Sequence, residues 1–259
     1  MILDQILEQT RRAVTSARGG APFAELEKQV AMTPAVRDFA AALRTSTGVA
    51  CIAEFKRRSP SKGWINQHAN PSVVAAAYQA AGAAALSVLT DGPFFGGSMQ
   101  DLRQVRATVQ IPVLRKDFII DPYQIVEARA AGADAVLLIV AALPQDQLVD
   151  LLAEVRRWGM EALVETHDRA EVERALAAKA RVIGVNHRDL CTFQMDMALA
   201  TNLRPLIPSD RVLVAESGIR SAEDVKRMEA AGIDAILVGT GLMAGPDPGL
   251  ALRGLLGRP

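Results

Sequence analysis

Eight short apolar runs recur along the chain, and each is followed by a polar turn and then by a stretch with helical spacing. The runs are apolar throughout rather than at alternate positions, which is typical of strands buried on both faces of a parallel sheet. Eight strand–helix units within about 250 residues are typical of a (β/α)8, or TIM, barrel. We therefore predict this α/β fold, with strands at residues 49–54, 84–89, 111–115, 135–140, 161–165, 181–185, 211–215 and 235–239.

Three of the predicted helices end in the same way, with Ala-Gly placed just before the next run. These endings lie at Gly82, Gly132 and Gly232, where glycine can take the left-handed conformation that stops a helix. Their recurrence indicates an internal strand–helix repeat. The alternative is a doubly wound open sheet. No Gly-x-Gly-x-x-Gly follows the first run, so the main sequence evidence for a dinucleotide-binding sheet is absent.

The 48 residues before the first run carry helical patterns of their own. An amphipathic helix is predicted from Ile2 through Val14, and a second helix at residues 34–43. We interpret residues 1–48 as an N-terminal helical extension that packs over the N-terminal mouth of the barrel or beside the active site. No linker-like change of composition separates it from residues 49–259, so residues 1–259 are predicted to form one domain.

Composition excludes several classes of protein. Lys plus Arg and Asp plus Glu both number 29, so the basic face expected of a nucleic-acid binder is not indicated. Cys51 and Cys191 are too few for a disulfide framework, which favours a reducing cytoplasm. The longest apolar run, residues 135–143, is far shorter than the roughly 20 residues of a membrane span. No metal-ligand spacing appears, and we expect no metal and no cofactor.

Polar residues follow seven of the eight runs, at the end of the strand where a barrel keeps its chemistry. Any one of them alone is more often a solvated loop residue, and Glu54 with Lys56 would also make an ordinary structural salt bridge. Together, buried lysines and glutamates in one mouth are unfavourable unless they are paired or used. The strand-end residues singled out are Glu54, Lys56, Ser59, Lys116, Glu165, Asn186, Arg188 and Glu216.

The last two strand ends add a signal for an anion. Ser217-Gly218 and Gly239-Thr240-Gly241 offer hydroxyls and backbone N–H groups, and a short helix after Gly241 would point its N-terminus at a phosphate. Barrel enzymes often bind phosphate between strands seven and eight. The alternative is that these glycines only make tight turns.

The segment Ile-Ala-Glu-Phe-Lys-Arg-Arg-Ser-Pro-Ser at residues 52–61 resembles the first-strand signature of the indole-3-glycerol phosphate synthase family. Blocks at residues 90–98, 112–120, 134–140, 184–190 and 214–219 resemble that family in the same order. The resemblance covers essentially the whole chain. It implies a carboxy-lyase of tryptophan biosynthesis that closes 1-(2-carboxyphenylamino)-1-deoxyribulose 5-phosphate to indole-3-glycerol phosphate, with loss of CO2 and water.

The resemblance also implies roles for individual residues. Lys116 is the expected general acid on the ketone oxygen, with burial lowering its pKa towards the working range. Glu165 is the expected base that completes dehydration, and Lys56 engages the substrate carboxylate and donates a proton in that step. Glu54, Asn186 and Glu216 are expected to position the substrate. The expected substrate-binding residues are Ser59, Phe95, Leu137, Ile139, Arg188, Ser217, Gly218, Leu237, Gly239 and Thr240, of which Leu137 and Ile139 are almost as well explained as barrel core.

Histidines and cysteines are assigned no catalytic role. Strand alternation should point His187 away from its neighbours Asn186 and Arg188, so we expect it to pack. His68 and His167 are expected at the surface. Neither cysteine has a base placed to activate it.

Two further expectations concern a loop and the oligomeric state, and two other functions stand as alternatives. The loop at residues 57–69 is hypothesised to close over the substrate, and the chain is expected to be a monomer. The runner-up function is another phosphate-binding barrel enzyme, such as a phosphoribosyl isomerase, which should lack the first-strand motif. A non-catalytic barrel module should have lost part of the ring of lysines and glutamates, which this chain retains.

Overall fold

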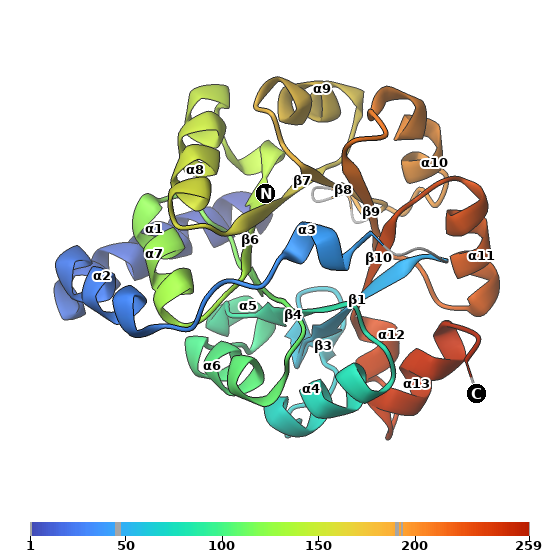
Figure 1. The fold of residues 1–259 in the computed structure, drawn as a ribbon, viewed down its shortest axis with the longest axis horizontal. Coiled ribbons are helices and arrows are strands. Elements are labelled where there is room, and N and C mark those ends of the chain that lie inside the picture. The colour runs from blue at the N-terminus through green and yellow to red at the C-terminus, as the bar shows by residue number, and fades with distance from the viewer. Residues whose placement is uncertain (1, 45–47, 190–191, 193, 259) are drawn as a thin grey trace.

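The computed structural model describes residues 2–44, 48–189, 192 and 194–258, and within them eight parallel strands close into a barrel (Figure 1). The first strand, β1, pairs with both β4 and β10, which closes the barrel. The barrel prediction is confirmed and the open-sheet alternative is wrong. The strands, all within two residues of the predicted runs, are β1 (Ala50–Phe55), β4 (Ala85–Leu89), β5 (Val113–Lys116), β6 (Ala135–Ile139), β7 (Glu161–Thr166), β8 (Val182–Asn186), β9 (Val212–Glu216) and β10 (Ala235–Val238).

Helices surround the strands on every side (Figure 1). Ser221 and Asp224 form a capping box, and the glycines at 82, 132 and 232 take positive φ angles of 90°, 93° and 70°. The outer helices are α4 (Pro71–Ala80), α6 (Met99–Thr108), α7 (Pro122–Ala130), α8 (Gln145–Arg157), α9 (Arg169–Ala177), α10 (Leu199–Leu203), α11 (Ala222–Ala230) and α13 (Pro248–Leu255). Short helices are α5 (Gly92–Phe95), α12 (Thr240–Met243), and the 3-10 turns η1 (Val140–Ala142) and η2 (Arg204–Leu206).

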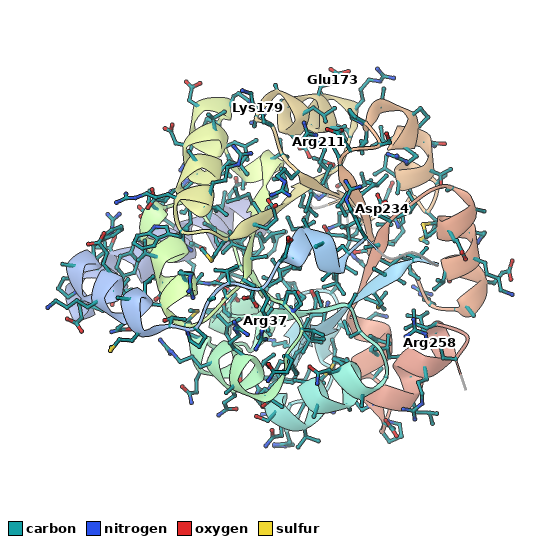
Figure 2. All side chains as sticks on the ribbon, in the orientation of Figure 1. Arg37, Glu173, Lys179, Arg211, Asp234 and Arg258 are labelled. Carbon is teal, nitrogen blue, oxygen red and sulfur yellow. The ribbon has the colours of Figure 1, made fainter. Side chains whose placement is uncertain are left out.

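The N-terminal extension forms α1 (Ile2–Gly20), α2 (Phe23–Met32) and α3 (Phe39–Ala42). Of the helix predicted at residues 34–43, only Phe39–Ala42 is helical, and the prediction is wrong for residues 34–38. The backbone N–H of Arg37 instead donates to Asp134, 2.8 Å away, and its guanidinium donates to the carbonyl of Ile111 at 2.7 Å. These bonds fasten the segment to the barrel; Arg37 is labelled in Figure 2.

The extension contacts the barrel at two places. Helix α3 lies across the end of the barrel that faces the viewer in Figure 1, where Phe39 and Leu43 pack with the barrel interior. The first turn of α1 reaches the opposite, C-terminal side, where Ile2, Leu3 and Ile6 line a cavity. The extension therefore lies at both predicted places, over the N-terminal mouth and beside the candidate site. Among the described helices, none combines the length and apolarity that crossing a membrane requires.

Alternate residues of the strands fill the barrel interior in layers. Ile52, Leu114, Leu163 and Val214 belong to the buried inner layer. Two residues further along the same strands come Glu54, Lys116, Glu165 and Glu216. Because side chains on a strand alternate with a period of two, the polar groups stand on the same inward face, one layer above the apolar core.

Candidate active site

A cavity of about 410 Å³ opens at the C-terminal end of the barrel. The structure brings all sixteen predicted site residues to its wall, from strands β1, β5, β6, β7, β8, β9 and β10, the segments that follow them, and α5, which follows β4. Their roles remain predictions. The lining includes Glu54, Lys56, Ser59, Phe95, Lys116, Leu137, Ile139, Glu165, Asn186, Arg188, Glu216, Ser217, Gly218, Leu237, Gly239 and Thr240.

Lys116 stands between two carboxylates. Its Nζ lies 3.2 Å from Oε2 of Glu165 and also donates a short hydrogen bond to Oε2 of Glu216. Oε1 of Glu165 accepts from the side-chain amide of Asn186 at 3.2 Å. The three ionisable side chains are almost completely buried, at 13%, 3% and 2% side-chain exposure. A proton transferred between Lys116 and either glutamate would therefore pass between atoms that are already in contact.

A second ion pair lies beside the first. Nζ of Lys56 donates to Oε1 of Glu54 at 2.6 Å, and the Ser87 hydroxyl lies 3.4 Å from Oε2. The salt bridge that was the alternative interpretation of Glu54 and Lys56, two residues apart in the sequence, is present. It faces the cavity, so it can also meet a ligand.

The buried charges shift one another's pKa values. Burial by itself would lower the pKa of Lys116, but the carboxylates of Glu216, Glu165 and Glu54 raise it above its ordinary value. The prediction that burial lowers this pKa is therefore wrong, because ion pairing outweighs desolvation. Burial raises the pKa of Glu216 to about 7. It would raise that of Glu165 too, but Lys116, His167 and Asn186 hold it below its usual range.

Two glycines give the carboxylates room. A Cβ on Gly184 would lie 2.2 Å from Oε1 of Glu216, and one on Gly239 would lie 2.3 Å from Oε1 of Glu54. Gly239 is among the predicted residues, but Gly184 was missed. Its signal is a lone glycine inside a strand, which often marks a close approach by a neighbouring group.

The turns after β9 and β10 form one side of the cavity. Ser217 and Gly218 both have positive φ, at 67° and 81°, in the left-handed region that is common in tight turns. Thr240 begins α12, so the predicted short helix starts one residue before Gly241 rather than after it. Ser217, Gly218, Gly239 and Thr240 all face the cavity, which agrees with the phosphate prediction in position.

The predicted loop at residues 57–69 contains a small hairpin of β2 (Arg58–Ser59) and β3 (Gly63–Trp64). Ser59 and Lys62 line the cavity, and the hairpin is fastened at its base by Arg57, whose guanidinium binds Asp101 with two bonds of 2.7 and 2.8 Å. Closure of this loop stays a hypothesis.

Two of the three histidines lie where they were predicted to lie, and the third does not. His68 is exposed, as expected, and His187 is buried behind the site, with Nδ1 2.9 Å from the carbonyl of Ser217. The surface assignment of His167 is wrong: its side chain is only 10% exposed and lies against Glu165. Strand alternation contained the signal, since His167 is two residues beyond Glu165.

The apolar wall of the cavity includes residues of α1, whereas Cys51 is not among its lining residues. Cys51 packs in the core, where burial raises the pKa of its thiol to about 12, and Cys191 lies outside the described residues. Ile2, Leu3 and Ile6 of α1 join the predicted apolar wall and were missed, although their amphipathic pattern was visible. Within the described part of the chain, no group of three or more His, Cys, Asp or Glu side chains is arranged to hold a metal ion.

This chain is similar to known proteins in both fold and sequence. A solved thiamine phosphate pyrophosphorylase from Pyrococcus furiosus superposes with a TM-score of 0.61 at 15% identity, over 80% of this chain and 94% of its own, which is a likeness of fold alone. Indole-3-glycerol phosphate synthase 2 of Streptomyces coelicolor is 55% identical over 234 residues, 90% of each chain. Indole-3-glycerol phosphate synthase of Rhodopirellula baltica is 47% identical over 255 residues, 98% of each chain. The sequence model of that family matches residues 3–255, and the chain therefore belongs to the indole-3-glycerol phosphate synthase family.

Proposed function

We propose that this enzyme closes 1-(2-carboxyphenylamino)-1-deoxyribulose 5-phosphate to indole-3-glycerol phosphate, with Lys116 as general acid and Glu165 as base. The observation that carries the assignment of roles is the position of Lys116, whose Nζ contacts both Glu165 and Glu216 within a cavity that also has an apolar wall. Family membership over nearly the whole chain supports the reaction.

The first step joins an aromatic carbon to the ketone carbon. Lys116 donates its proton to the ketone oxygen as the bond forms. Its raised pKa keeps it charged before the step, and a developing alkoxide is a stronger base than an amine. The cation therefore stabilises the oxyanion and then protonates it. Loss of CO2 returns the bonding electron pair to the ring and leaves a hydroxyl on the former ketone carbon.

The second half of the reaction removes that hydroxyl as water. Lys56, paired with Glu54 at 2.6 Å, donates the proton that leaves with the hydroxyl, and before this it binds the substrate carboxylate. Glu165 removes the proton from the adjacent carbon, which completes the aromatic indole. Its lowered pKa keeps it ionised and able to act as a base at neutral pH.

The remaining residues bind the two ends of the substrate. Ser217, Gly218, Gly239 and Thr240 are assigned to the phosphate, because they present N–H groups and hydroxyls where β9 and β10 end. Asn186 and Glu216 position the ribulose part, and Arg188 and Ser59 face the substrate from the rim. The aromatic ring is assigned to the apolar wall formed by Phe95, Leu137, Ile139 and Leu237.

The setting of the enzyme is part of the proposal. We propose a monomer that acts in the cytoplasm on a small phosphorylated substrate. We also propose that it has no nucleic-acid partner, because acidic and basic residues balance at 29 each. Light scattering during size-exclusion chromatography should give the mass of one chain; a mass of two chains would contradict the monomer.

The test is turnover followed by indole fluorescence, with wild type compared with Lys116→Ala and Lys116→Gln. Loss of about 10²-fold or more in kcat for both variants would support Lys116 as the acid, provided that circular dichroism shows both to be folded. Lys56→Ala is the matched comparison. If Lys116 variants turn over as fast as wild type while Lys56→Ala does not, the acid is Lys56. Folded wild type without turnover would refute the proposed reaction.

A further inference from the structure

His167 connects the candidate base to the first turn of a surrounding helix. It follows β7 directly, and its Nε2 lies 3.3 Å from Oε1 of Glu165. Its Nδ1 lies 3.0 Å from Oε2 of Glu171, and the same oxygen accepts the backbone N–H of His167 at 2.7 Å. The imidazole therefore bridges two carboxylates, one inside the barrel and one on α9.

The two oxygens of Glu165 have different surroundings. Oε1 is contacted by the imidazole of His167 and by the amide of Asn186, 3.2 Å away. Oε2 faces Nζ of Lys116. The hydrogen bond from Asn186 and the ion-pair contact from His167, which lacks hydrogen-bond geometry, both meet Oε1, so that Oε2 is the oxygen turned towards the reacting groups.

The bridge carries a positive charge at neutral pH. Burial alone would lower the pKa of His167, but Glu165 and Glu171 together raise it to about 10. These are the titratable groups that face the imidazole, Glu165 from β7 and Glu171 from α9. Lys116 and Glu216 come next, through the pair that Lys116 makes with Glu165.

The bridge is not needed to begin α9. The side chain of Asp168 already caps that helix by accepting from the backbone N–H of Glu171 at 2.8 Å. The link from His167 to Glu165 thus needs another explanation.

We propose that His167 is a positioning residue for this reaction: it holds Oε1 of Glu165 from behind and anchors that carboxylate to Glu171. The inference rests on the proposed function, in which Glu165 is the base. It predicts that the position and the ionisation of Glu165 depend on a side chain that itself never touches substrate.

Two isosteric variants separate orientation from charge. His167→Gln places an amide nitrogen near the site of Nε2, so it should keep Glu165 oriented but remove the charge. His167→Asn places one near Nδ1, so it should keep only the link to Glu171. Since a cation within a few ångströms lowers a carboxyl pKa by about 1–3 units, the acid limb of the pH profile should move up by about one unit in both. Only His167→Asn should also lower the plateau of kcat, by about tenfold or more.

A double-mutant comparison tests whether His167 acts through Glu165. In a Glu165→Gln background, His167→Asn should cause no further loss, because the interaction is already absent. A further loss equal to that of the single variant, or acid limbs unchanged in both single variants, would overturn the inference. Equal melting temperatures would show that the variants remain folded.

A measurement without substrate keeps the inference separate from the proposed reaction. The chain has three histidines, so NMR titration can follow each imidazole. His167 should stay protonated beyond about pH 8, and Glu165→Gln should lower its pKa. If the pKa of His167 is ordinary and does not change in Glu165→Gln, the bridge is refuted. Folded wild type without turnover would refute the reaction instead, and the titration would then decide the bridge alone.

Discussion

Replacing Glu216 with glutamine should stabilise the folded chain at alkaline pH while it lowers activity. Burial raises the pKa of this carboxyl from 4.5 to about 7, with Lys116 opposing the shift and Glu165 adding to it. A carboxyl with a higher pKa in the folded than in the unfolded chain loses stability as the pH rises through that interval. At about 1.4 kcal/mol per pKa unit, the ionised carboxylate destabilises the fold by about 3 kcal/mol above the upper pKa.

Glutamine imitates the protonated acid and avoids that penalty. Oε1 of Glu216 has no hydrogen-bond partner among the described residues, so the amide can keep its oxygen towards Lys116 without breaking a second bond. Activity should fall because Lys116 loses a charged neighbour.

Thermal and urea unfolding at about pH 5 and about pH 8.5 would measure the effect. At roughly 2–4 °C per kcal/mol, the melting temperature of Glu216→Gln should exceed that of wild type by several degrees at the higher pH and by much less at the lower. Glu173→Gln is the control: it lies in an exposed pair with Arg169, at 3.4 Å, on the periphery in Figure 2, and should shift little at either pH. A Glu216→Gln protein that is destabilised more at about pH 8.5 than at about pH 5 would refute the reasoning.

Two other substitutions test the geometry around the cavity. Gly184→Ala places a Cβ 2.2 Å from Oε1 of Glu216, so kcat should fall by about 10²-fold; Gly254→Ala, which meets nothing within 4 Å in α13, should keep wild-type kinetics and gain about 0.5–1 kcal/mol. Equal kinetics for the two would contradict the close approach. Arg57→Ala leaves the buried carboxylate of Asp101 without its cation and with the Ser98 hydroxyl as a remaining partner, and should lower the free energy of unfolding by about 3 kcal/mol; limited proteolysis should then cut the following hairpin faster, and unchanged unfolding would count against the anchor.

The fold was predictable from the sequence because every barrel strand is covered on both sides. A strand such as Ala135–Ile139 must be apolar at all positions to pack against helices outside and side chains inside. The ends of seven of the eight strands were predictable for the complementary reason: polar residues that recur at strand ends would be unfavourable inside a core. Lys116 and Glu216 could therefore be placed at the same mouth before any contact between them was known.

The failures concern interactions that depend on partners distant in sequence. Residues 34–38 look helical in isolation, but Arg37 uses its backbone N–H for Asp134 in the barrel. The pKa of Lys116 was predicted from burial alone, whereas three carboxylates from other strands reverse the shift. His167 was the avoidable error, because its two-residue spacing from Glu165 is the argument that correctly paired Glu54 with Lys56.

The repeated Ala-Gly-x-Asp-Ala segments have a second function besides ending helices. Oδ2 of Asp134 accepts the backbone N–H of Val113 at 2.9 Å, and Oδ2 of Asp234 accepts that of Leu213 at 2.8 Å. Each bond fixes the start of the preceding strand at the N-terminal end of the barrel. Lys116 on β5 and Glu216 on β9 form the central ion pair. They lie three residues beyond Val113 and Leu213, respectively. A slip of one residue would turn either side chain from the inside of the barrel to the outside. The buried aspartates at one end therefore determine which side chains can meet at the other.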